Sequence, residues 1–232
     1  MNSLQSLTFI DLTHTLNPTV PNWNGNCGFK NNVVVNYADC KTKTKFCVQT
    51  FEMNAGIGTH MDAPAHCFSD GKTISDIPLG QLINPCVVIN IADKCHESYQ
   101  VSIDDILHFE KQYGKIEKHH FVIIRTGWDK YWSQPEKYRN NLKFPTVSSD
   151  VAELLLQREI VGLGIDTLSP DSDSGDFPVH DLVLGAGKYI VENIANAHLL
   201  PPTNSYVIAL PLKIKDGTES PIRLIAGYQK EK

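Results

Sequence analysis

Residues 56–66 read Gly-Ile-Gly-Thr-His-Met-Asp-Ala-Pro-Ala-His, a stretch that holds two histidines, a carboxylate and a proline. His60 and Asp62 are two positions apart, so on an extended backbone their side chains project from the same face, with Cα atoms roughly 6–7 Å apart. Adjacent nitrogen and oxygen donors suit a divalent metal ion such as zinc or manganese. Pro64 cannot continue a central strand and is expected to turn the chain, which could bring His66 back toward the same centre.

The same stretch also fits a simpler interpretation, in which a strand ends in a polar loop and both histidines are solvated. A single His-x-Asp pair would favour that interpretation. The additional donor His66 and the two glycines before His60 favour a metal site instead.

The composition is typical of a globular protein. The length of 232 residues fits one large domain spanning residues 1–232, and 41% hydrophobic with 20% charged residues can form a sizeable core. A net charge of −5 argues against a nucleic-acid partner, which would require a basic face. The start of the chain lacks the pattern of a signal peptide, and no segment approaches the ~18–20 apolar residues of a membrane span. We therefore expect a cytoplasmic protein with no membrane partner.

The cysteines show no C-x-x-C pair, and in a chain of this size without an export signal we expect them to be reduced thiols. Cys67 directly follows His66 and could lie near the site, but a role as ligand or nucleophile is not favoured. The six cysteines are Cys27, Cys40, Cys47, Cys67, Cys86 and Cys95.

Hydrophobic patterning predicts strands and helices without a regular βαβ repeat, so the pattern alone indicates α/β or α+β. Strands are predicted over 8–13, 31–37, 46–54, 85–92, 121–126, 160–166, 188–194, 205–210 and 222–226. Helices are predicted over 102–109 and 149–158, with one or two helical turns over 181–186. The segments 17–29 and 217–221 are rich in turn residues and are predicted to be a loop and a turn.

Two further side chains stand out. Trp23 lies in the predicted loop and either covers a pocket or packs beneath the loop. Glu192 shares a strand face with Ile190 and Ile194, where a carboxylate costs several kcal/mol unless it is paired or binds a metal. A buried ion pair with Arg125 or Arg223 is the alternative.

His60, Asp62, His66, His180 and Glu192 together form a candidate metallohydrolase set. A bound divalent ion would lower the pKa of a water molecule toward neutrality and polarise a carbonyl group. A histidine not bound to the metal could act as general base and then protonate the leaving group.

Residues 58–66 resemble the signature of the cyclase-like metal-dependent hydrolases, which include bacterial kynurenine formamidase and isatin hydrolase. The resemblance extends along nearly the whole chain, and the twelve-residue spacing between His180 and Glu192 also fits. The other matching blocks are 11–13, 125–128, 164–166, 180–187 and 191–193.

This resemblance implies a swivelling β/β/α type fold with a mixed sheet, and a homo-oligomer, either a dimer or a tetramer. It implies hydrolysis of a non-peptide C–N bond in a small amide or cyclic amide, with arylformamidase chemistry in the kynurenine pathway as one candidate. By the family's pattern His60 and Asp62 are metal ligands, and Asp62 is able to bridge two ions. His180 and Glu192 hold the second ion.

The resemblance also assigns two residues outside the ligand set. His66 is the catalytic acid/base, and Trp23 lines the substrate pocket.

The chain departs from the family at Gly56, where the usual motif His-x-Gly-Thr-His places a histidine. Residues 56, 58, 60 and 62 share strand parity, so the missing imidazole would point at the same centre. Losing one ligand could cost several kcal/mol of metal affinity. Either one ion remains at Asp62, His180 and Glu192, or another donor compensates.

Asn54 and Glu52, on the same strand face as Gly56, are the candidate replacement donors. Without a replacement the protein would be a catalytically impaired family member that binds a small ligand. A hydrolase with a serine or cysteine nucleophile is disfavoured, because no G-x-S-x-G elbow occurs.

The remaining polar residues near these segments are expected to be structural. Asp166 and Asp171 follow a predicted buried strand and could organise a loop. Six histidines are expected to be solvated, namely His14, His96, His108, His119, His120 and His198.

Overall fold

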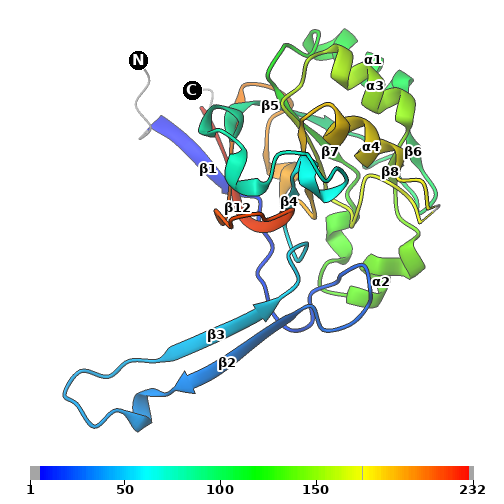
Figure 1. The fold of residues 1–232 in the computed structure, drawn as a ribbon. Helices are drawn as coiled ribbons and strands as arrows, with labels where there is room; N and C mark the ends of the chain where they lie inside the picture. The colour runs from blue at the N-terminus through cyan, green and yellow to red at the C-terminus, as the bar shows by residue number, and fades with distance from the viewer. Residues whose placement is uncertain (1–5, 174, 230–232) are drawn as a thin grey trace.

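The computed structural model describes residues 6–173 and 175–229 and shows an α/β fold around one mixed sheet (Figure 1). The strand order is β1-β12-β11-β5-β7-β9-β10-β4, and β4 also pairs with β12. This last pairing closes the sheet into a barrel-like ring, with β1 added on β12. The strands are β1 (Leu7–Asp11), β4 (His60–Asp62), β5 (Ile83–Asn90), β7 (Phe121–Arg125), β9 (Gly162–Ile165), β10 (Tyr189–Glu192), β11 (Ser205–Pro211) and β12 (Glu219–Gln229). The predicted α/β class with a mixed sheet is confirmed.

The centre of the sheet is parallel and is buried on both faces. Strands β5, β7, β9 and β10 run parallel, and β7 is a continuous apolar run, as expected for a strand covered on both sides. Phe121 and Ile123 face the inside of the ring, whereas Val122 and Ile124 pack in a second core cluster with residues of the helices. Those helices are α1 (Ile103–Tyr113), α3 (Ser149–Gln157) and α4 (Pro178–Gly185), which cover the same side of the sheet (Figure 1). No helix in the described ranges is long and apolar enough to span a membrane.

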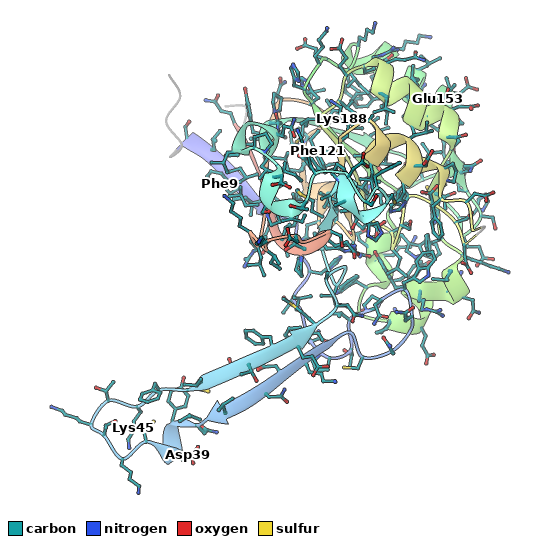
Figure 2. The ribbon with its side chains drawn as sticks, in the orientation of Figure 1. Phe9, Asp39, Lys45, Phe121, Glu153 and Lys188 are labelled. Atoms are coloured by element: carbon teal, nitrogen blue, oxygen red, sulfur yellow. The ribbon has the colours of Figure 1, made fainter. Side chains whose placement is uncertain are left out.

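A two-stranded hairpin of β2 (Phe29–Val35) and β3 (Val48–Met53) projects away from this body. Figure 2 shows the arm extending to its tip near Asp39 and Lys45. Its strands match the predicted segments 31–37 and 46–54 to within a few residues. The remaining short elements are β6 (Gln100–Val101) paired with β8 (Thr146–Val147), and the helix α2 (Pro135–Arg139).

Two predicted boundaries close to the site are wrong. Helix α4 begins at Pro178 rather than at residue 181, because proline is well suited to the first turn of a helix. The predicted turn 217–221 overlaps β12, which already begins at Glu219. Pro221 is tolerated there because residues 219–221 pair only with β4, and the ladder with β11 begins at Ile222.

His14 is not solvated as predicted. Its ring stacks on Trp132, with the ring centroids 3.8 Å apart and the planes 9° from parallel. Its Nε2 atom is buried and finds no hydrogen-bond partner among the described residues. Burial lowers the pKa of His14 to about 4, despite the opposing effect of Asp11. Of the other five histidines, His120 is half-buried, and His96, His108, His119 and His198 are exposed.

The depressed pKa of His14 predicts a stability loss in mild acid. The unfolded chain binds a proton here below about pH 6.5 and the folded chain only below about pH 4, so stability falls as the pH drops through this range. When the pH drops from 7 to 5, the free energy of unfolding of the wild type should fall by about 1–2 kcal/mol more than that of His14→Phe, which has no imidazole to protonate at this position. Urea unfolding at the two pH values measures this difference. His198→Asn, at an exposed histidine, should behave like the wild type, and equal losses in all three proteins would contradict the burial of His14.

Candidate metal centre

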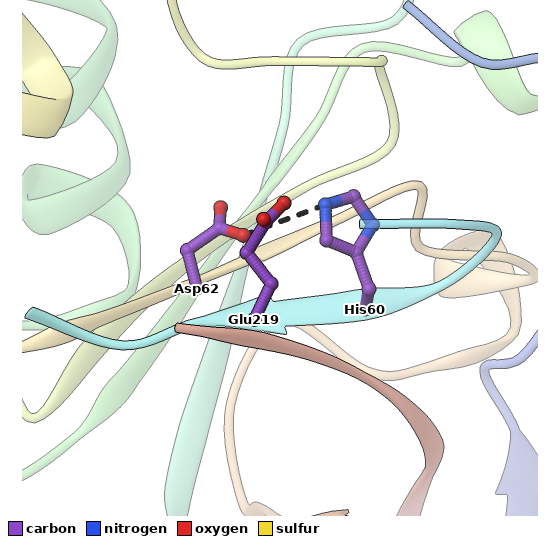
Figure 3. Close-up of side chains that lie close together, drawn as sticks. All are labelled: His60, Asp62 and Glu219. Carbon is purple, nitrogen blue, oxygen red and sulfur yellow. Dashed lines mark ion pairs between the residues drawn. The ribbon is translucent and has the colours of Figure 1, made fainter. Parts of the chain in front are cut away.

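Strand β4 is the platform of the site. It pairs with β10 so that His60 lies opposite Glu192, and it pairs with β12 so that Asp62 lies opposite Glu219. As the two-residue spacing predicted, His60 and Asp62 project from one face, and His60 Nε2 lies 3.5 Å from Asp62 Oδ1 (Figure 3). Because directly opposed residues of antiparallel strands share a face, both neighbouring strands add carboxylates to the same centre.

Helix α4 contributes the next donor. His180 Nε2 lies 3.7 Å from Asp62 Oδ2 and 3.4 Å from Glu192 Oε1. Glu192 Oε2 in turn lies 3.3 Å from His60 Nε2. All four side chains are buried, so the structure brings together His60, Asp62, His180 and Glu192, which the sequence placed in one candidate site.

Hydrogen bonds behind the two imidazoles fix their orientation. His60 Nδ1 lies 2.8 Å from the Gly58 carbonyl, which can only accept, so Nδ1 is the donor. His180 Nδ1 lies 2.7 Å from Asp171 Oδ2. Each ring therefore presents Nε2 to the carboxylates of Asp62 and Glu192, the arrangement by which proteins orient histidine ligands of a metal.

The surroundings of the Asp62 carboxylate show whether a metal ion fits this cluster. Both of its carboxylate oxygens are buried and have no hydrogen-bond partner among the described residues, which is costly for a carboxylate without a compensating ligand. Its separations of 3.5 and 3.7 Å from the imidazole nitrogens exceed good hydrogen-bond lengths. Two ligands of one tetrahedral zinc ion, with bonds of about 2.1 Å, lie roughly 3.4 Å apart. The donor set therefore fits a divalent metal ion.

The charges in the cluster compensate one another in the absence of a metal. Burial lowers the pKa of His60, but Asp62 and Glu192 outweigh burial and raise this pKa to about 10. Burial is likewise outweighed at His180, whose pKa is raised by Asp171, Asp62 and Glu192. Burial raises the pKa of Glu192, yet the two imidazoles hold it below its usual value. Metal binding must therefore release protons from these histidines.

His66 lies at the edge of the cluster. It ends the short 3-10 turn η3 (Pro64–His66), so the chain turns at Pro64 as predicted. Its ring centroid lies 6.0 Å from that of His180, and its Nδ1 lies 3.4 Å from Glu219 Oε2. Contact with Glu219 raises the pKa of His66 despite partial burial. The side chain keeps 35% of its surface exposed, so it is open to solvent while the ligand candidates are not.

The cluster forms the floor of a cavity of about 260 Å³. Trp23 lines this cavity and also packs beside Phe177 and Phe144, with centroid separations of 5.8 and 6.4 Å, so it both faces the pocket and packs under its loop. The lining residues are Trp23, Gly56, His60, Asp62, His66, Leu168, Ser169, Phe177, His180, Glu192, Asn193 and Glu219.

Several expectations about neighbouring donors are wrong. Glu52 is exposed on the arm and pairs with Lys30 at 2.9 Å, and neither Glu52 nor Asn54 lines the cavity. Arg125 donates to Asn90. Arg223 pairs with Asp11, so neither arginine neutralises Glu192.

Asp166 and Asp171 have the structural roles expected of them. Asp171 accepts hydrogen bonds from the backbone amides of Val179 and His180 at the start of α4. Asp166 accepts from Thr126 and the backbone amide of Gly127. Asp171 thus holds the start of α4 beside the site, and Asp166 holds the turn that follows β7.

Glu219, Asn193 and Ser169 are polar cavity residues that were not predicted from the sequence. Asn193 has a left-handed backbone, with φ of 56°, and donates to the Gly58 carbonyl at 2.9 Å. The signal for Asn193 was its position directly after the strand that ends at Glu192. Asparagine tolerates a left-handed backbone well at such a point. Glu219 was not predicted because it lies in a segment whose composition predicts a turn.

Comparison with known proteins gives consistent similarities. Residues 10–172 match the family model described as "Putative cyclase". The chain is 32% identical over 188 residues to an isatin hydrolase of Roseibium aggregatum, covering 73% of this chain and 70% of that protein. It is 25% identical over 229 residues to a kynurenine formamidase of Bacillus cytotoxicus, covering 96% and 98%. A solved isatin hydrolase bound to the product analogue thioisatinate superposes with a TM-score of 0.88 at 27% identity, covering 97% and 94%.

The hydrogen bond from His180 to Asp171 predicts a measurable effect on metal affinity. In Asp171→Asn the amide cannot replace the charged acceptor behind His180, so Zn²⁺ affinity should fall by roughly 10- to 100-fold. Titration calorimetry on metal-stripped protein measures this Zn²⁺ affinity. Asp173→Asn, an exposed change in the same loop, serves as the control. If Asp171→Asn binds Zn²⁺ as tightly as the wild type, then Asp171 does not orient His180 as a metal ligand.

Proposed function

The chain belongs to the cyclase family and is a hydrolase, and we propose that it cleaves the C–N bond of a small amide or cyclic amide with a divalent metal ion. The family resemblance of residues 58–66 is thereby confirmed. One observation carries the metal dependence: the buried, unpartnered carboxylate of Asp62 faces two oriented imidazoles. The alternative of an impaired, ligand-binding relative is not favoured, since His60, His180 and Glu192 still converge with Asp62 despite the glycine at position 56.

We assign the metal to His60, Asp62, His180 and Glu192. The two Asp62 oxygens face different imidazoles, which suits a carboxylate that bridges two ions. Mixed nitrogen and oxygen donors suit Zn²⁺ and Mn²⁺. When bound, the ion supplies polarisation of the substrate carbonyl and a water of lowered pKa.

His66 is the proposed acid/base. Its Nδ1 faces Glu219, which leaves Nε2 free to exchange a proton with water and with the departing nitrogen. Its raised pKa suits the return of the proton to that nitrogen. The partly exposed position lets it reach a substrate above the buried ligands.

The substrate we propose is a small aromatic amide. Trp23 and Phe177 form an aromatic wall beside the cluster, which suits an aryl group. The relatives are named isatin hydrolase and kynurenine formamidase, so N-formyl anilides and cyclic amides such as isatin are the first compounds to assay. The described cysteines are free thiols, which suits the reducing cytoplasm.

Removal of the His66 imidazole should impair turnover without emptying the metal site. His66→Ala should lower kcat on an N-formyl anilide by on the order of 10²–10⁴-fold, the usual contribution of a general acid/base. The metal content per chain, measured by elemental analysis, should stay at the wild-type level. His198→Ala, at an exposed histidine, is the matched control. Full activity in His66→Ala would remove His66 from the mechanism.

We also propose that the chain forms a homodimer through the arm. A two-stranded hairpin alone is at best marginally stable in water, and this one exposes apolar side chains on both strands. Val33 and Phe51 share one face of the hairpin and are 52% and 60% exposed. A second copy of the chain would cover this surface, and the family resemblance favours the same conclusion.

The arm predicts a change in native mass. Phe51→Glu places a charge in the apolar surface and should shift the protein toward the 25.9 kDa monomer, as measured by light scattering coupled to size exclusion. Thr50→Glu, on the opposite face of the same strand, should keep the wild-type mass. A wild-type protein that is monomeric at micromolar concentration would contradict the dimer.

A further inference from the structure

Glu219 enters the site from a strand that contributes no predicted ligand. It is the first residue of β12 and lies directly opposite Asp62 in the pairing with β4. Figure 3 shows Glu219 rising beside His60 and Asp62 on the same side of the sheet. Its carboxylate therefore faces the centre because of strand register.

Gly56 leaves the space that this carboxylate fills. A Cβ atom built on Gly56 would collide with Oε1 of Glu219 and lie 3.2 Å from Nε2 of His60. Position 56 thus faces the same centre, at the place where the family pattern expects a histidine. A side chain at position 56 and the observed position of Glu219 exclude one another.

The donor atoms form a second potential metal-binding group. Nitrogen or oxygen atoms of His60, Asp62 and Glu219 lie within 4.8 Å of one another, as do those of Asp62, His180 and Glu192. Asp62 belongs to both groups, and neither of its oxygens has a hydrogen-bond partner in the described part of the chain.

Glu219 is a partly buried carboxylate whose neutralising contact is His66. It is 22% exposed, and within residues 6–173 and 175–229 its one ion-pair partner is His66, at 3.4 Å. With Asp62 and Glu192 it brings the carboxylates of the cluster to three. One divalent ion would leave one of these three negative charges uncompensated, whereas two ions would supply enough positive charge for all three carboxylates.

We propose that Glu219 is a ligand of a second divalent ion, shared with His60 and Asp62, and that it replaces the imidazole missing at Gly56. The inference rests on the proposed metal dependence and specifies the composition of the site. Exchange of imidazole for carboxylate makes this half of the site richer in oxygen. It should therefore favour Mn²⁺ relative to Zn²⁺.

Metal stoichiometry tests the proposal directly. Full-length protein is stripped with a chelator and titrated with Mn²⁺ or Zn²⁺ by calorimetry, with elemental analysis as the second readout. The wild type should bind two ions per chain. Glu219→Gln keeps the side-chain shape but removes the charge, and should weaken the second ion at least tenfold. Glu153→Gln, exposed on α3, should match the wild type.

Two further variants separate a ligand from a residue that only orients His66. His66→Ala should retain both ions, whereas loss of the second ion in this variant would contradict the proposal. Gly56→His combined with Glu219→Gly exchanges the donors and should restore the second site with its preference shifted toward Zn²⁺. Circular dichroism confirms that each variant is folded.

The outcomes distinguish this inference from the proposed function. One ion per wild-type chain would overturn the role of Glu219 and leave a hydrolase with one ion at Asp62, His180 and Glu192. Two ions with unchanged affinity in Glu219→Gln would also overturn it. A wild-type protein that binds neither metal would overturn both proposals.

Discussion

The site depends on the pairing of β4 with two strands at once. Three residues, His60 to Asp62, pair with β10 on one side and with β12 on the other. These pairings close the ring of strands and fix which side chains share a face with His60 and Asp62. Strand β10 contributes Glu192 and strand β12 contributes Glu219, so the pairings that close the sheet also bring these two carboxylates to the site.

A second constraint is electrostatic. Burial of several carboxylates beside two imidazoles is costly unless every charge has a partner. Hydrogen bonds to Gly58 and Asp171 hold both imidazoles with Nε2 toward the carboxylates, but at 3.5 and 3.7 Å from the Asp62 oxygens, which is too far for good hydrogen bonds. A divalent ion would satisfy those oxygens, so metal binding and the stability of this fold should be coupled.

The local half of the site was predictable from the sequence. The two-residue period placed His60 and Asp62 on one face, Pro64 explained the return of His66, and the apolar strand around Glu192 marked a carboxylate with a special role. Long-range register was not predictable in this way. Residues 217–221 have the composition of a turn, and only pairing with β4 extends β12 to Glu219. His14 was mistaken for a solvated residue because its stacking on Trp132 joins segments far apart in the chain.

A crystal structure of the Mn²⁺-loaded protein with anomalous diffraction data would test most directly whether Asp62 is shared by two metal ions. We expect strong anomalous peaks on both sides of the Asp62 carboxylate, each about 2.0–2.3 Å from one of its oxygens. One peak should also contact His180 and Glu192, and the other His60 and Glu219. Anomalous density only outside the cavity, with Asp62 still unliganded, would contradict the role of Asp62 as the shared ligand of a metal centre.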